Sequence, residues 1–159
     1  MIGKEPIMRS SDGRKPLTEI IRLALSDNAF RIPYTDEGGF ISTDIGEKHD
    51  DEFIRIHICG VMSDSGMMCQ TIEIIYLETE KKVREFISSP EGAGFSHWSS
   101  DPMGGYELST YAGDPRIPGR IAAILKRFYG FTESSPVEAF TECEVDYFRK
   151  GEPQPKIYT

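Results

Sequence analysis

Apolar residues spaced three and four positions apart predict two helices in the first 90 residues. The first runs from about 16 to 28 and has one apolar face made of Leu17, Ile20, Ile21, Ala24 and Leu25. A second, shorter helix is expected within "LETEKKVREFISSP" at 77–90, with an apolar face made of Val83, Phe86 and Ile87. Each helix therefore has one side to bury against a core.

The strongest helical pattern follows Tyr111. Asp114 is the expected N-cap, Pro115 suits the first helical position, and Gly130 supplies the left-handed residue that commonly follows the end of a helix. The apolar stripe between these signals consists of Ile117, Ile121, Ile124, Leu125 and Phe128. The sequence thus predicts an amphipathic helix closed at both ends.

Between 53 and 76 the apolar positions alternate with polar ones, which is the period of strands. The alternating core positions are Ile54, Ile56 and Ile58 in one strand and Ile72, Ile74 and Tyr76 in the next. If both sets face one core, the paired residue numbers must sum to an even value, and Cys59 lies opposite or diagonal to Cys69. Further strands are expected at 30–34, 40–45, 95–98 and 106–111.

These elements predict an α+β fold, with a single antiparallel sheet of five or six strands and helices packed mainly on one face. We expect a flexible tail at 1–15, one domain at 16–149 and a second tail at 150–159. The stretch "SPVE" has the form of a capping box from Ser135 to Glu138 and predicts a last helix near the end of the domain, reaching about 148.

The chain carries 18 basic and 26 acidic residues among 159, a formal net charge of -8. This charge argues against nucleic acid, where Lys and Arg must neutralise phosphates, and fits either a basic protein partner or a well-hydrated surface. The opening has no apolar signal segment, no run is long enough to cross a bilayer, and three cysteines without framework spacing fit reduced thiols. We expect a cytoplasmic protein with no membrane partner.

The stretch "IRIHICG" puts His57 and Cys59 two residues apart on a strand, and Cys69 can lie beside them across the hairpin. With His97 or a carboxylate as a fourth ligand they could hold zinc, and His57 could activate a thiol. The paired Cys or His spacings of structural zinc sites are missing, so we predict no metal, no cofactor and no catalytic residue. A metal- or thiol-dependent protein using His57, Cys59 and Cys69 stays open as an alternative.

One segment is crowded with acidic residues: Asp36, Glu37, Asp44, Glu47, Asp50, Asp51 and Glu52. Its spacing lacks the alternation of a calcium loop, so we interpret it as a solvated face. If that face has a function, it attracts a basic partner and accelerates encounter.

The sheet face opposite the isoleucines is the candidate binding surface. Met and aromatic side chains there are adaptable and are enriched in binding sites, although helices could instead cover them as ordinary core. The candidate partner-binding residues are Phe53, Val61, Met67, Met68, Trp98, Tyr106 and Tyr111.

The element order helix, antiparallel strands, helix, two strands, helix, together with "GFSHW" and "PRIPGRIAAILKRFYGF", resembles small chaperone-like domains. These are the type III secretion chaperones, the YbjN-like proteins and the TY-Chap domains, and the resemblance covers residues 16–131. It implies a cytoplasmic, acidic, often dimeric protein that binds another polypeptide through an exposed sheet or hydrophobic patches without catalytic residues. The chain departs from that pattern in its Met-rich "SDSG" hairpin and in its continuation beyond Phe131.

We therefore expect a non-enzymatic protein-binding module, chaperone- or adaptor-like, that holds another polypeptide by strand addition and hydrophobic contact. The close alternative is an immunity protein whose acidic surface neutralises a basic toxin. A homodimer is compatible with both.

Overall fold

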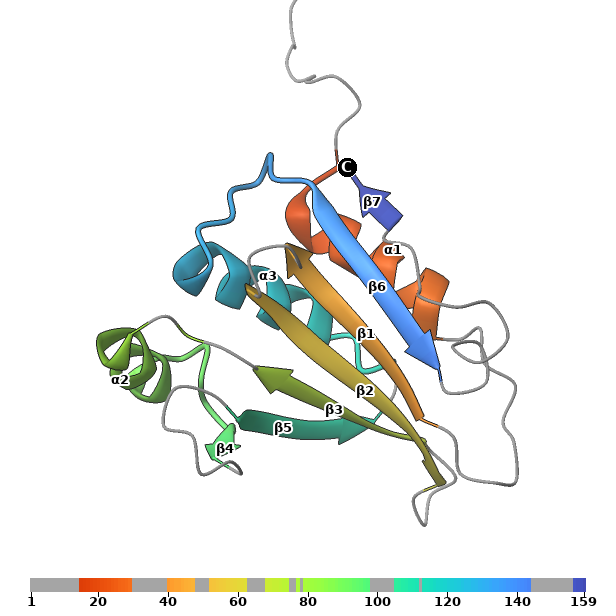
Figure 1. Cartoon of the computed structure of the whole chain (residues 1–159), viewed down its shortest axis with the longest axis horizontal. Helices are drawn as coiled ribbons and strands as arrows, with labels where there is room; N and C mark the ends of the chain where they lie inside the picture. Colours follow the sequence, from red (N-terminus) through yellow and green to blue (C-terminus); the bar gives the residue numbers. More distant parts are fainter. Residues whose placement is uncertain are drawn as a thin grey trace, which may run out of the picture.

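In the part of the chain that the structure describes, three helices lie on one face of an antiparallel sheet (Figure 1). The computed structural model describes residues 15–29, 40–47, 52–62, 68–74, 77, 79–97, 105–111, 113–143 and 156–159. The helices are α1 (Leu17–Ala29), α2 (Glu80–Ser88) and α3 (Ile117–Phe128). The strands are β1 (Phe40–Glu47), β2 (Glu52–Met62), β3 (Met68–Ile74), β4 (Ser96–His97), β5 (Tyr106–Tyr111), β6 (Val137–Cys143) and β7 (Lys156–Tyr158).

The strands follow the order β4-β5-β3-β2-β1-β6-β7, and each neighbouring pair is antiparallel. The α+β class and the antiparallel pairing predicted from the sequence are confirmed. The expected count of five or six strands is wrong, because β6 and β7 extend the sheet beyond β1 and bring the described strands to seven. The strand expected at 30–34 lies outside the described residues.

The predicted register between β2 and β3 is confirmed. Ile54 pairs with Ile74 and Ile56 pairs with Ile72, so the residue numbers sum to an even value. Ile54, Ile72 and Ile74 are fully buried, as the expected core face requires. Further along, the register shifts between Ile58 and Met62, which marks a bulge or irregularity in the ladder.

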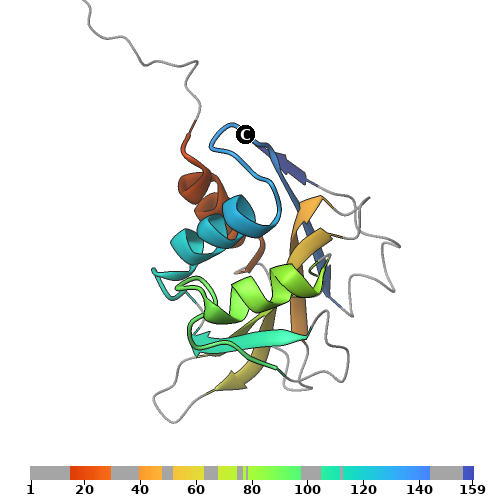
Figure 2. The same cartoon turned by 90° about the vertical axis from the view of Figure 1, so that its left-hand side faces the viewer.

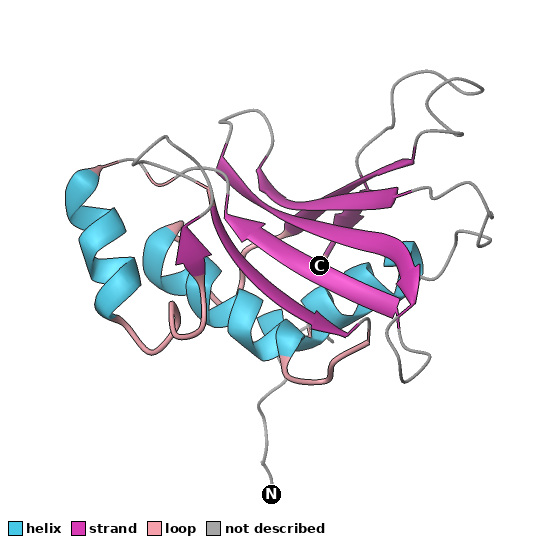
Figure 3. Ribbon diagram, turned by 90° about the horizontal axis from the view of Figure 1, so that it is seen from below, coloured by secondary structure: helices cyan, strands magenta, loops and turns pink. Residues whose placement is uncertain are grey.

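Helices α1 and α3 contact each other and cover the same face of the sheet, as Figure 2 and Figure 3 show from two sides. Every member of the predicted α3 stripe is buried, and in α1 only Leu25 of the predicted stripe is partly exposed. Each fully buried Leu, Ile or Phe side chain contributes about 1.5–3 kcal/mol. No helix of the described ranges is long and apolar enough to cross a membrane.

Helix α2 packs against this core through one aromatic residue. The Phe86 ring meets the rings of Phe95, Tyr106 and Phe128 in edge-on geometry, with centroids 5.1, 5.8 and 5.4 Å away. The prediction that Ile87 shares the buried face is wrong, because Ile87 is 57% exposed. The buried stripe of α2 is narrow, limited to Val83 and Phe86, since the helix lies beside one end of the sheet rather than across it (Figure 1).

The segment after α3 forms strands where a helix and a tail were expected. In β6, Val137 and Ala139 are buried and Glu138 between them is half-buried, which is a strand alternation. Backbone pairing with β1 on one side and β7 on the other decides this conformation against the local capping-box pattern. Within the expected tail, Tyr158 of β7 is only 9% exposed.

The entry into α3 also differs from the prediction. Arg116, not Asp114, occupies the N-cap position, and Pro118 rather than Pro115 lies in the first turn. Asp114 acts one step earlier: its Oδ1 accepts the backbone N–H of Arg116 at 3.0 Å and closes the turn before the helix. Gly130 has a φ of 72°, so the predicted left-handed residue after α3 is confirmed.

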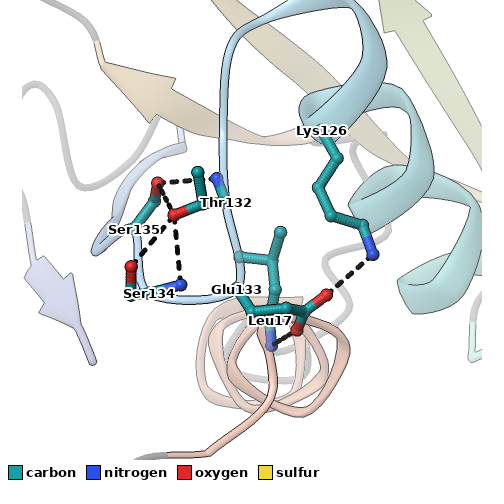
Figure 4. Close-up of polar contacts among 6 residues, drawn as sticks. All are labelled: Leu17, Lys126, Thr132, Glu133, Ser134 and Ser135. Atoms are coloured by element: carbon teal, nitrogen blue, oxygen red, sulfur yellow. Dashed lines mark hydrogen bonds and ion pairs between the residues drawn. The ribbon is translucent and has the colours of Figure 1, made fainter.

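The loop after α3 caps the start of α1 (Figure 4). The Leu17 backbone N–H donates to Glu133 Oε1 at 2.9 Å, and Lys126 Nζ lies 2.7 Å from Glu133 Oε2. The loop itself is held by Ser135, whose Oγ accepts the Thr132 N–H at 2.9 Å. A free donor at the helix start is thus satisfied by a residue 116 positions away in sequence.

Candidate functional site

The sheet face opposite the helices, here called the open face, has a polar described surface. Strands alternate their side chains between the two faces, and Ile72, Ile74 and Tyr106 are buried on the helix side. The described side chains on the opposite side are Thr71, Glu73, Ser96, Glu107, Ser109, Tyr111, Glu138 and Ile157. Among these eight there are three carboxylates and no Lys or Arg, so this part of the face is acidic.

Two of the carboxylates are neighbours across strands. Glu73 of β3 pairs in register with Glu107 of β5, and both side chains are half-buried. Like charges directly opposite one another destabilise a sheet. On its other side Glu73 pairs with Arg55 of β2, so a cationic residue occupies the next register position.

Of the predicted partner-binding residues, Tyr111 is the one whose described side chain is open to solvent. It is 37% exposed and ends β5 on the open face, opposite Cys69. Met68 pairs with Met62 at the start of β3, and Phe53 pairs with Gly46. The structure places the backbone of Val61 in β2 and does not describe the side chains of Phe53, Val61 and Met68; Met67 and Trp98 lie outside the described residues altogether.

The prediction for Tyr106 is wrong. Tyr106 is 6% exposed and packs between Phe86 and the stacked ring of His97, whose centroid is 4.8 Å away. Its position on β5 has the parity of the core, so it points to the helix side, and burial raises the pKa of its hydroxyl. Tyr106 therefore stabilises the attachment of α2 and is not a surface contact.

The backbone register brings His57, Cys59 and Cys69 close together on β2 and β3, because Ile58 pairs with Gln70, but it leaves His97 apart from them. Cys59 falls within the stretch where the β2–β3 register shifts, and His57 pairs with Ser42 and Thr71. Cys69 pairs with Tyr111 and His97 with Tyr106, so His97 and Cys69 are separated by five positions along β5, about 17 Å. Among the described side chains, no group of three His, Cys, Asp or Glu could hold a metal ion.

The acidic segment is brought together in part. Glu47 and Glu52 pair at the ends of β1 and β2, and Asp44 pairs with Arg55. Asp36, Glu37, Asp50 and Asp51 lie outside the described residues.

A second candidate is a cleft on the helix side of the sheet. It has a volume of about 290 Å³ and opens between α1, β3 and the turn that leads into α3. Its lining comprises Arg22, Leu25, Ser26, Gln70, Gly113, Asp114, Pro115, Ile117 and Pro118. The walls are mainly apolar, and two deeply buried polar side chains, Gln70 and Asp114, take part in the lining.

Asp114 is fully engaged within the protein. Its carboxylate accepts from Thr110 Oγ1 at 2.6 Å and from Arg116 Nε and Nη2 at 3.0 and 2.7 Å, besides the Arg116 backbone N–H. These hydrogen bonds, those of the Arg116 side chain above all, hold the pKa of Asp114 well below its usual range. At the rim, Arg22 is paired with Glu19 through Nε at 2.8 Å.

Sequence reasoning missed Gln70 as a site residue, although a signal was present. In "MCQTIEI" the glutamine has the same strand parity as Ile72 and Ile74, so it is a polar residue at a core position. Gln70 is 4% exposed, and no described residue forms a hydrogen bond with its side chain. Such a residue at a core position of a strand is a functional signal that the apolar pattern alone conceals.

Comparison of the chain with protein-family models, curated proteins and solved structures gave no match.

Proposed function

We propose that this protein is a non-enzymatic binding module that holds a basic polypeptide against the open face of its sheet. The observation that carries the proposal is the acidic character of that face, where Glu73, Glu107 and Glu138 are its described charged side chains. The formal net charge of -8 also attracts a positively charged partner at long range.

Electrostatic attraction and contact have separate roles in this proposal. The carboxylates raise the rate of encounter with a cationic segment and select against acidic partners. Tyr111, half-exposed beside them, supplies an amphipathic ring of the kind that anchors interfaces. The described part of the open face therefore favours charged contact over the hydrophobic contact expected from the sequence.

A chaperone or adaptor and an immunity protein would both use such a face. The resemblance to chaperone-like domains, which bind polypeptides through an exposed sheet, supports the chaperone or adaptor role. An immunity protein is the alternative, and the identity of the bound polypeptide distinguishes them: an unstable or secreted client in one case, a basic toxin in the other. The metal- or thiol-dependent alternative would use His57, Cys59 and Cys69, whose backbone positions are close together on β2 and β3, without His97, which lies about five positions away along β5.

Two double variants with the same charge change test the open face. Glu73→Gln with Glu107→Gln removes two carboxylates from it, whereas Glu80→Gln with Glu85→Gln removes two from the exposed surface of α2. Tagged wild type and both variants are used to capture partners from the native cell for mass spectrometry, and the purified partner is then titrated by calorimetry at two salt concentrations.

We expect a dominant basic polypeptide whose affinity drops at least about tenfold, or 1.4 kcal/mol, in the open-face variant and falls with salt. The α2 variant should bind within about twofold of wild type, because its lost charges are on the helix side. Equal affinities of the two variants, or a partner that is acidic, would contradict the proposal. Circular dichroism confirms that both variants fold.

A further inference from the structure

The cleft beside α1 contains one polar group whose bonding needs the described residues leave unmet. Gln70 is 4% exposed, lines the cleft, and no described residue hydrogen-bonds its carboxamide. A buried amide without a partner destabilises a protein, and nearly all such groups are paired. The carboxamide offers both an acceptor oxygen and an NH₂ donor, so a group with an adjacent donor and acceptor would satisfy it in full.

The charges around the cleft are already balanced. Asp114 is compensated by Arg116 and Thr110, and Arg22 at the rim is paired with Glu19. An anion would approach the Asp114 carboxylate, and a cation would find that carboxylate already saturated by donors. A neutral ligand therefore fits the cleft better than an ion.

The remaining lining selects for an apolar body. Leu25, Pro115, Ile117 and Pro118 supply hydrocarbon walls, and a volume of about 290 Å³ accommodates a small molecule or a ring. We infer that the cleft binds a small neutral molecule with an apolar body and one amide-like group, which pairs with the Gln70 carboxamide. This site lies on the helix side of the sheet and is independent of binding at the open face.

Benzamide is the probe that matches this chemistry, and two analogues isolate its parts. Benzoate replaces the amide with an anion, and acetophenone keeps the carbonyl acceptor but lacks the donor. Each is titrated into ¹⁵N-labelled full-length protein while the backbone amides and the Gln70 side-chain NH₂ signals are followed. We expect saturable benzamide shifts confined to the cleft lining, with a Kd on the order of 1 mM for so small a ligand, and binding of both analogues weaker by at least about tenfold.

Three variants locate the interaction. Gln70→Leu removes the amide and keeps a side chain of similar size, so it should abolish the preference for benzamide and raise Tm by relieving the unpaired polar group. Ser26→Phe fills the mouth of the cleft from the exposed side of α1 and should block binding. Ser88→Phe makes the same exchange at the exposed end of α2 and should leave binding unchanged.

Several results would overturn the inference. Equal benzamide affinity in Gln70→Leu would show that the apolar walls alone bind the ring. The absence of benzamide shifts would show that ordered water, not a ligand, satisfies the amide. Nuclear Overhauser contacts from the Gln70 amide to another segment of the free chain would show that the cleft is filled internally. If Gln70→Leu fails to fold, the comparison of Ser26→Phe with Ser88→Phe still decides the site.

Discussion

At the scale of single residues, Asp114 and Gln70 show two different ways of burying a polar group. Asp114 is a charge with a side chain 1% exposed, and its carboxylate accepts four hydrogen bonds. A buried charge without such partners would be strongly unfavourable, whereas a buried neutral amide such as Gln70, which no described residue hydrogen-bonds, costs less. The hydrogen bonds of Asp114 therefore contribute to stability, while Gln70 is the residue that we propose to bind a ligand.

Replacement of Asp114 by Asn should lower the free energy of unfolding by about 1–3 kcal/mol at pH 7, because the charge-assisted hydrogen bonds become weaker. The pKa of Asp114 is lower in the native state than its ordinary value of 3.8. Its stabilisation is therefore complete above that value and is lost as pH falls below about 4, where the unfolded chain takes up a proton first. Urea unfolding from pH 7 down to pH 2 measures both effects.

The control for this prediction is Glu80→Gln, an exposed carboxylate on α2. The control should follow the wild-type profile, and Asp114→Asn should lose less stability on acidification than wild type. Parallel acid profiles for wild type and Asp114→Asn would show that this carboxylate is not the one that titrates differently on folding.

At the scale of elements, the ends of the helices depend on residues from other elements. Glu133 satisfies the first N–H of α1, and the turn after α2 is held by α3, whose Arg120 Nη2 donates to the Glu91 carbonyl at 3.0 Å. Arg127 of α3 also pairs with the Glu91 carboxylate at 2.6 Å. Local capping rules therefore describe only part of what fixes these ends.

Glu133→Ala should fray the start of α1 and cost about 0.5–1 kcal/mol, because Leu17 loses its acceptor and Lys126 its partner. Lys126→Ala removes only the exposed ion pair and should cost less than about 0.5 kcal/mol. Hydrogen exchange of the first-turn amides of α1 separates the two effects. Equal exchange protection in both variants would mean that the ion pair, not the cap, is the stabilising contact.

Gly92→Ala should destabilise the protein by about 2–3 kcal/mol, since a Cβ there would overlap the Phe86 carbonyl oxygen and lie 2.9 Å from its carbon. Gly119 in the first turn of α3 is the matched control, because a Cβ there meets nothing within 4 Å. Gly119→Ala should stabilise by about 0.5 kcal/mol through helix propensity. Thermal unfolding measures both, and a neutral Gly92→Ala would mean that the turn after α2 adjusts at little energetic cost.

At the scale of the whole molecule, the first and last described elements, α1 and β7, lie together at one edge of the sheet. Strand β7 pairs with β6 at the edge of the sheet and contacts α1, so residues 156–158 lie beside the first helix (Figure 1). Tyr158 faces the core and is nearly buried, whereas Ile157 is 60% exposed on the open face. The edge of the sheet is thus completed by the last residues of the chain.

Tyr158→Ala should cost about 2–4 kcal/mol, because it removes a nearly buried ring from the junction of β6, β7 and α1. Ile157→Ala, one residue away and exposed, should change stability by less than about 0.5 kcal/mol. Chemical denaturation gives both values. Comparable losses in the two variants would indicate that strand pairing rather than the Tyr158 ring stabilises this edge.

Much of the core could be predicted, because burial repeats with the period of the local structure. The α3 stripe, the even sum of paired residue numbers between β2 and β3, and the strand at Tyr106–Tyr111 followed from spacing alone. The candidate sites could not, because they join segments distant in sequence. In the sequence, Gln70 is one polar residue in a strand. Only the fold brings α1 and the turn at Asp114 next to it and so forms the cleft.

The strand β6 near the C-terminus could not be predicted from the local sequence. "SPVE" satisfies a capping box and carries no long-range information, so it predicted a helix where the described residues Val137–Cys143 form a strand. The edge of β1 provides backbone hydrogen-bond partners along the length of β6. This pairing is stronger than the local preference for a helix, which rests on the hydrogen bonds of one capping box.

The sequence by itself determined the periodic faces, the turns at glycine and the acidic charge, since these depend on neighbouring residues and on composition. Only the tertiary structure decided the number of strands, the burial of Tyr106, the cap that Glu133 supplies to α1, and the cleft at Gln70. Each of these depends on contacts between elements far apart in the chain, where packing and backbone pairing override local preference.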